Sequence, residues 1–300
     1  MHLTTLLLAM LLAVAPARAA ETLHVVATTP DLGAIATAVG GDAVEVTSLA
    51  RPGEDPHFVD ARPSFIRVVN QAEAFVEGGA GLEAGWLAPL LDGARNPRLA
   101  LGAPGRIAAN ANVAMKDVPT ALDRSLGDVH PFGNPHYLLD PENGTLAART
   151  IAAGLCAVDH TRCDTFTRNA ETFGRTIDER LRGWQSALAG ARGTKVVTYH
   201  RAFDYFAARF GLDVVGTLEP KPGIPPSPAH LAELVPRMAE AKVRLILVEP
   251  FREPKTADFV AEKTGAKVVR IPLMPGGPEA HDYVELLDYA VRQVQAALAP

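Results

Sequence analysis

Residues 165–189, TFTRNAETFGRTIDERLRGWQSALA, contain no proline and carry their large apolar side chains at helical spacing. The spacings are three, four and seven residues, as on one face of an amphipathic helix, and the residues concerned are Phe166, Phe173, Ile177, Leu181, Trp184 and Leu188. At 1.5 Å per residue, a helix of this length reaches about 37 Å. We therefore predict that one rigid helix runs the length of a two-lobed molecule and joins its halves.

On both sides of this helix, short β-branched runs alternate with helical segments, which is typical of α/β architecture with mostly parallel sheets. The predicted strands are Leu23–Thr28, Val44–Leu49, Ala74–Glu77 and Arg98–Leu101 in the first half, and Lys195–Tyr199, Val214–Leu218, Arg244–Val248 and Lys267–Ile271 in the second. Helices are predicted over residues 32–39, 63–72, 202–210, 228–241 and 257–264. The expected fold is thus α/β, with two lobes that each hold a mostly parallel sheet flanked by helices.

The N-terminus carries an apolar run, Leu6–Val14, that is shorter than the roughly 20 residues of a membrane-spanning helix. Ala17-Arg18-Ala19 places small residues where a signal peptidase cleaves, so we predict a signal peptide over residues 1–19. A buried N-terminal helix is the alternative. The remaining domains are then a first lobe over 20–163, the linking helix over 164–190 and a second lobe over 191–300.

Composition excludes two classes of function. Hydrophobic residues make up 48% of the chain and charged residues 21%, which is enough apolar material for a packed core. Lys and Arg number 29 against 34 Asp and Glu, a net charge of -5, and no basic block offers a nucleic-acid surface. We therefore do not expect nucleic-acid binding. Direct membrane insertion is not expected either, because the apolar run Leu6–Val14 is too short to span a bilayer.

The two cysteines, Cys156 and Cys163, are separated by six residues. In an oxidising compartment this spacing indicates a disulfide that closes a small loop between two helices. Two free thiols are the alternative. A thiolate metal site is disfavoured because the sequence has no second cysteine pair.

Three of the nine histidines come where a strand or turn has just ended: His57, His136 and His200. A fourth loop of this kind, after the last predicted strand, carries His281 and Asp282. In open α/β sheets such loops meet at the carboxyl ends of the strands. Three imidazoles and one carboxylate would form a tetrahedral site for a divalent metal ion. Taken singly, each histidine is more often a solvated or capping residue than a ligand.

Three motifs around these histidines resemble the solute-binding proteins of zinc and manganese ABC importers. They are GEDPHFVDARPS at residues 53–64, GNPHYLLDP at 133–141 and YHRAFDYF at 199–206. The resemblance extends over the whole mature chain. It implies two α/β lobes bridged by a rigid helix with one metal ion between them, and it places His57, His136 and His200 on the first three ligand positions.

The fourth ligand departs from the family pattern, in which an Asp comes shortly before an aromatic residue. Here the string is Glu279-Ala-His281-Asp282-Tyr283, so either His281 or Asp282 could take that position. We favour Asp282 because a carboxylate partly neutralises the charge of the ion at a desolvated interface.

Other polar residues near these motifs are candidates for supporting roles. Where many zinc members carry a histidine-rich insert, this chain has only His130, a candidate auxiliary ligand. Four carboxylates that follow strands or flank a ligand could orient a ligand imidazole or simply face water; they are Glu54, Asp55, Glu219 and Glu249.

The resemblance implies a periplasmic solute-binding protein and not an enzyme: it would bind Zn²⁺ as transported cargo and deliver it to an inner-membrane ABC permease. We expect a monomer, with a periplasmic metallochaperone as a second candidate partner. A nitrogen ligand at His200 favours Zn²⁺ over Mn²⁺. The alternatives are Mn²⁺ as cargo, an adhesin of the same fold, and a secreted zinc hydrolase, for which the sequence has neither an H-E-x-x-H nor a G-x-S-x-G motif.

Overall fold

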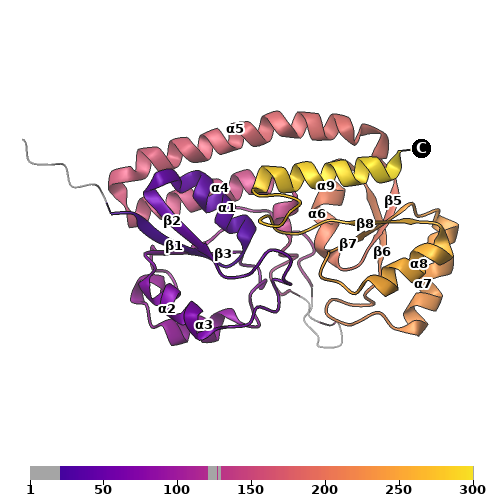
Figure 1. Ribbon diagram of the computed structural model, residues 1–300, viewed down its shortest axis with the longest axis horizontal. Coiled ribbons are helices and arrows are strands. Elements are labelled where there is room, and N and C mark those ends of the chain that lie inside the picture. The colour runs from indigo at the N-terminus through magenta and orange to yellow at the C-terminus, as the bar shows by residue number, and fades with distance from the viewer. Residues whose placement is uncertain (1–20, 121–126, 128–129, 300) are drawn as a thin grey trace, which may run out of the picture.

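The structure is a computed structural model that describes residues 21–120, 127 and 130–299. Two lobes lie next to each other, each built on a four-stranded parallel sheet (Figure 1). The predicted α/β class is therefore confirmed. The predicted signal peptide over residues 1–19 lies outside the described part of the chain. No helix in the described part is long and apolar enough to span a membrane.

The first lobe holds a sheet in the order β2-β1-β3-β4. Its strands are β1 (Leu23–Ala27), β2 (Val44–Ser48), β3 (Ala74–Glu77) and β4 (Arg106–Ala108), and its helices are α1 (Pro30–Gly40), α2 (Pro63–Gln71) and α3 (Leu87–Ala94). The predicted strand Arg98–Leu101 is wrong. Residues Pro97–Leu99 form a 3₁₀ turn, since the side chain of Asn96 accepts a hydrogen bond from the amide of Arg98 and caps it.

The second lobe repeats this order as β6-β5-β7-β8. Its strands are β5 (Lys195–Thr198), β6 (Asp213–Thr217), β7 (Leu245–Val248) and β8 (Lys267–Arg270), and its helices are α6 (Asp204–Phe210), α7 (Pro228–Ala241), α8 (Pro254–Thr264) and α9 (Tyr283–Leu298). Ser227 caps α7 by accepting from the amide of His230, with Pro228 in the first turn. The loops that follow the strands include the one that carries His57, after β2, and the one that carries His200, after β5.

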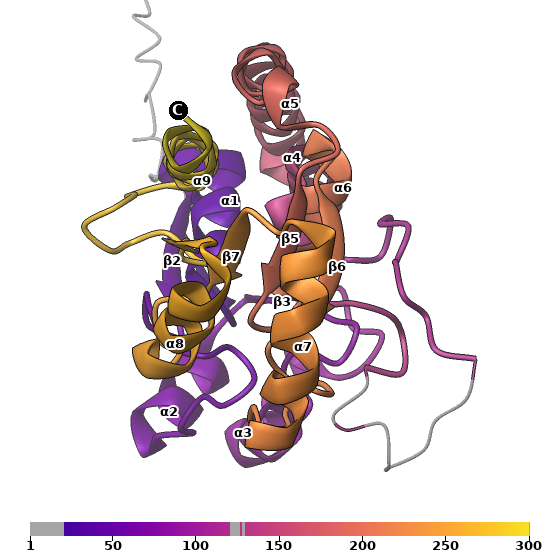
Figure 2. The same cartoon turned by 90° about the vertical axis from the view of Figure 1, so that its right-hand side faces the viewer.

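The predicted long helix is present as α5 (Cys163–Ala187) and follows α4 (Pro141–Val158). It runs along both lobes, and α9 packs against it on the same side of the molecule (Figure 1, Figure 2). The largest cluster of buried apolar side chains includes residues of both sheets and of α4, α5 and α9. Because the core is continuous across the two lobes, it resists large changes in their relative position.

The predicted disulfide is also present and joins Cys156, near the end of α4, to Cys163, the first residue of α5. It closes a short loop with a sequence separation of seven. The bond therefore holds the start of the long helix against α4.

This bond predicts that Cys156 and Cys163 resist alkylation in protein recovered from an oxidising compartment until a reductant is added. A Cys156→Ser, Cys163→Ser double variant should lose about 2–3 kcal/mol of unfolding free energy, because cross-linking a loop this small removes little entropy from the unfolded chain. Mass spectrometry after alkylation and denaturant unfolding measure the two effects. Complete alkylation without reductant would contradict the bond.

Candidate metal centre

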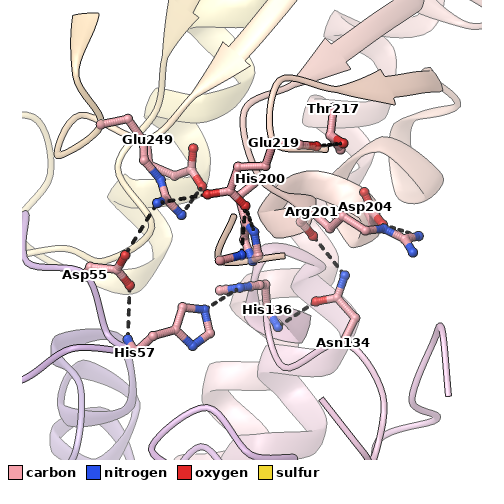
Figure 3. Close-up of polar contacts among 12 residues, drawn as sticks. Asp55, His57, Asn134, His136, His200, Arg201, Asp204, Thr217, Glu219 and Glu249 are labelled. Carbon is pink, nitrogen blue, oxygen red and sulfur yellow. Dashed lines mark hydrogen bonds and ion pairs between the residues drawn. The ribbon is translucent and has the colours of Figure 1, made fainter. Parts of the chain in front are cut away.

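The three predicted histidines come together between the lobes (Figure 3). His57 lies in the loop after β2, His136 lies shortly before α4, and His200 is the second residue after β5. One ligand nitrogen from each can be chosen so that all three lie within 4.8 Å of one another. The positions at strand ends and turns that singled these residues out thus place their rings at one point in space.

The separation of the ligand atoms fits one small ion. The Nε2 atoms of His57 and His136 are 3.2 Å apart. Two nitrogens bound to Zn²⁺ at 2.0–2.1 Å with a tetrahedral angle between them would lie about 3.3 Å apart. His136 and His200 are buried and His57 is half-buried, so an ion between them would be largely shielded from water.

Two of the rings are held by hydrogen bonds to their other nitrogen. The Nδ1 of His200 lies 2.8 Å from a carboxylate oxygen of Glu219, and the Nδ1 of His57 lies 3.3 Å from the carbonyl oxygen of Leu82. These contacts leave each Nε2 directed at the common point, as metal-binding histidines usually require. Glu219, one of the four carboxylates proposed from the sequence, thus holds the imidazole of His200, a candidate ligand.

The carboxylates beside His57 do not hold its ring. Asp55 accepts a hydrogen bond from the backbone amide of His57 at 3.0 Å, and Glu54 accepts one from the amide of Arg51 at 2.9 Å. Both side chains stabilise the turn that carries His57. The ring itself contacts Leu82, a partner that the sequence analysis did not predict, because any residue type offers a carbonyl oxygen.

Burial lowers the pKa of two of the three candidate ligand rings, those of His57 and His136. It lowers the pKa of His57 to about 3, with further lowering by the neighbouring His130 and His200 rings. The pKa of His136 is held well below its usual value, again chiefly by burial. Neutral imidazole is the form that binds a metal ion, so no proton has to leave these two residues when an ion enters at neutral pH.

Arg252 forms ion pairs with three carboxylates near His200. Its guanidinium lies 3.2 Å from Glu219, 3.6 Å from Glu249 and 3.7 Å from Asp55. Glu249 is fully buried; its carboxylate oxygens have no hydrogen-bond partner among the described residues, and burial raises its pKa. Because Asp55 precedes β3 and the other two carboxylates follow strands of the second lobe, Arg252 links the two ligand-bearing halves of the site.

His130 lies beside the three histidines but outside their group. Its ring stacks on that of His57 with 4.9 Å between the centroids. It lines two hollows beside the site, of about 310 and 210 Å³, which are also lined by His200. The auxiliary role expected for His130 therefore stays a prediction.

The structure does not bring Asp282 or His281 into the group of described residues that could share an ion. Asp282 is exposed and caps α9, where its carboxylate accepts a hydrogen bond from the amide of Glu285 at 2.8 Å. His281 is exposed too, and its amide donates to the Glu285 carboxylate. Only the following residue, Tyr283, reaches the loop of His136, through a 2.6 Å bond to the carbonyl of Leu138.

This placement predicts that Asp282→Ala lowers stability by about 1 kcal/mol, the usual cost of losing a helix cap. We expect zinc affinity to change by less than about threefold. Substituting an exposed residue away from a site usually changes a free energy by no more than about 0.5 kcal/mol. His281→Ala is the matched control from the same loop. Denaturant unfolding and chelator competition test both effects, and a larger fall in affinity for Asp282→Ala than for His281→Ala would restore Asp282 as a ligand.

Comparison with known proteins supports the assignment of the fold. The profile of the family described as "Zinc-uptake complex component A periplasmic" matches residues 25–297. The "High-affinity zinc uptake system protein ZnuA" of Brucella abortus (strain 2308) is 27% identical over 163 residues, 54% of this chain and 48% of that protein. The "Manganese ABC transporter substrate-binding lipoprotein PsaA" of Streptococcus mitis is 22% identical over 292 residues, 94% of this chain and 91% of that protein.

Solved structures show the same architecture. A crystal structure of ZnuA matches with a TM-score of 0.78 and 22% identity, and the match covers 93% of this chain and 100% of that one. The two lobes and the bridging helix are thus a shared fold. Its relatives include proteins named for zinc and for manganese.

Proposed function

We propose, on the premise that this chain belongs to the family of the periplasmic zinc-uptake complex component A, that it captures Zn²⁺ and delivers it to an inner-membrane ABC permease. The observation that carries this proposal is the group formed by His57, His136 and His200. Their imidazoles act as ligands to the transported ion, and a water molecule completes a tetrahedral shell. The ion is cargo, so the protein must release it as well as bind it.

The donor set supports Zn²⁺ over Mn²⁺ as the cargo. Imidazole nitrogen suits zinc, whereas manganese prefers carboxylate, carbonyl and water oxygens. The nearest carboxylate to a ligand ring, Glu219, is occupied by His200 and Arg252. Mn²⁺ would therefore meet three nitrogens at this site, which bind it more weakly than they bind zinc.

The two lobes both contribute ligands, and this arrangement provides a way to release the ion. His57 and His136 belong to the first-lobe part of the chain, while His200 follows the first strand of the second lobe. A small separation of the lobes withdraws one ligand from the other two and weakens the hold on the ion. We infer that docking on the permease causes this separation in the periplasm, with the protein acting as a monomer and a metallochaperone as a second candidate partner.

The alternatives have less support. A zinc hydrolase needs a general base beside the metal-bound water, but Glu219 is engaged by two partners and Asp55 is turned toward the amide of His57. For the adhesin alternative we find no supporting feature in residues 21–120 and 130–299.

The decisive experiment is a titration of metal-free mature protein with Zn²⁺ and Mn²⁺ against a chelator of known affinity. We expect one Zn²⁺ per chain with a sub-micromolar Kd and clearly weaker Mn²⁺ binding. Absence of zinc binding would disprove the function, and tighter binding of manganese would disprove the choice of cargo.

A further inference from the structure

A strained turn follows β3 and faces the metal centre. Gly79, Ala80 and Gly81 all have positive φ angles, of 72°, 54° and 87°. Glycine adopts this region without steric cost, but a residue with a Cβ such as Ala80 does not. Such a conformation persists where the surroundings impose it, and it occurs most often at functional sites.

One buried acid holds this turn in place. Glu83 is 2% exposed, and its Oε1 accepts hydrogen bonds from the amide of Gly78 at 2.6 Å and from the hydroxyl of Thr28 at 2.7 Å. Thr28 directly follows β1, so Glu83 fastens the turn to the edge of the sheet. The hydroxyl of Tyr137 donates to the carbonyl of Gly78 at 3.0 Å and fixes the start of the turn from the other side.

Residues at and after this turn also hold the loop that carries His57. The carbonyl of Leu82 lies 3.3 Å from the Nδ1 of His57. Four residues further on, the indole N–H of Trp86 donates to the carbonyl of Pro56 at 3.0 Å. A carbonyl oxygen can only accept, so the His57 ring must carry its proton on Nδ1, which leaves Nε2 free to bind an ion.

We propose that Glu83 is a positioning residue for metal capture, which holds the turn over residues 78–82 so that the Leu82 carbonyl selects the metal-binding tautomer of His57. This role rests on the proposed function, because it presumes that His57 is a ligand. Burial raises the pKa of Glu83 to about 7, chiefly by making the charged form costly, so the positioning role does not depend on a negative charge at this residue. Both hydrogen bonds need only an oxygen acceptor, which a neutral side chain can also provide.

The first test compares Glu83→Ala with Glu83→Gln in zinc titrations of the full mature chain against a chelator. The alanine variant should bind Zn²⁺ about tenfold more weakly, the usual effect of losing a group that orients a ligand. The glutamine variant keeps an oxygen acceptor and should stay within about threefold of wild type by the same reasoning. The matched control is Glu77→Gln, since Glu77 precedes the turn but pairs with Arg106 at 2.9 Å. Wild-type affinity in Glu83→Ala would overturn the proposal.

The second test reads the His57 tautomer directly in metal-free protein by NMR of ¹⁵N-labelled histidine, with the signal assigned from a His57→Gln variant. Wild type and Glu83→Gln should show the Nδ1-protonated tautomer, and Glu83→Ala a mixture of both. If Glu83→Ala does not fold, Thr28→Val removes one of the two bonds to Glu83 and should shift the tautomer in the same direction. An unchanged tautomer would overturn the role of Glu83, and this result does not depend on whether the wild-type chain binds zinc.

Discussion

His136→Ala should weaken Zn²⁺ binding by about tenfold or more, which is at least about 1.4 kcal/mol of binding free energy. His57→Ala and His200→Ala should do the same. Each removes one of three protein nitrogens that lie within 4.8 Å of one another. Water can replace a lost ligand, but it binds zinc less strongly than imidazole and must be immobilised on binding.

The measurement is a chelator competition with the metal-free variants, accompanied by thermal unfolding to show that each is folded. His230→Ala is the matched control, because this half-buried ring contacts the carbonyl of Thr217 and lies outside the metal group. It should bind zinc like the wild type. If any two of the three ligand variants titrate like the wild type, the assignment of the site is wrong.

Glu219→Ala should weaken Zn²⁺ binding by about 10- to 100-fold, the range found when a group that orients a metal-binding histidine is lost. Glu219 is 4% exposed and contacts the Nδ1 of His200 at 2.8 Å, so it fixes both the orientation of the ring and the position of its proton. Its removal also leaves Arg252 with fewer carboxylates to balance its charge beside the site. Both changes oppose the binding of a divalent cation.

The control for this variant is Glu249→Gln. Glu249 contacts the same guanidinium at 3.6 Å, and its carboxylate has no hydrogen bond to a ligand ring among the described residues. Its zinc affinity should stay much closer to that of the wild type. Equal losses in the two variants would mean that the charge around Arg252, and not the orientation of His200, determines affinity.

The fold could be predicted wherever a single segment carried a clear periodic pattern. The apolar spacing over residues 165–189 predicted α5, which the structure places at Cys163–Ala187. The last strand of the first lobe was predicted at the wrong residues, because its sequence pattern is weak. β4 is only three residues long, Arg106–Ala108, and so short a strand has no period to detect, whereas the nearby Arg98–Leu101 run is a capped turn.

The site could be predicted only in part. The positions of His57, His136 and His200 after strands and turns, together with their motifs, singled out the three residues that the structure brings together. The support of His57 by Leu82 was missed, because a backbone carbonyl leaves no trace in the residue type. The Gly-Gly-Ala-Gly run at residues 78–81, with Glu83 two residues after it, was an available signal of an unusual turn there.

By itself, therefore, the sequence determined the features that depend on neighbours within a few residues, such as the long helix, the capped start of α7 and the motifs around the histidines. Tertiary structure decided how those parts act on one another. His57 meets His136 across 79 residues, His200 meets Glu219 across 19, and His57 meets Leu82 across 25. Asp282 caps its own helix for the converse reason: an amide three residues away is always within reach, whereas a distant metal centre is reached only if the packing of the whole chain directs the side chain toward it.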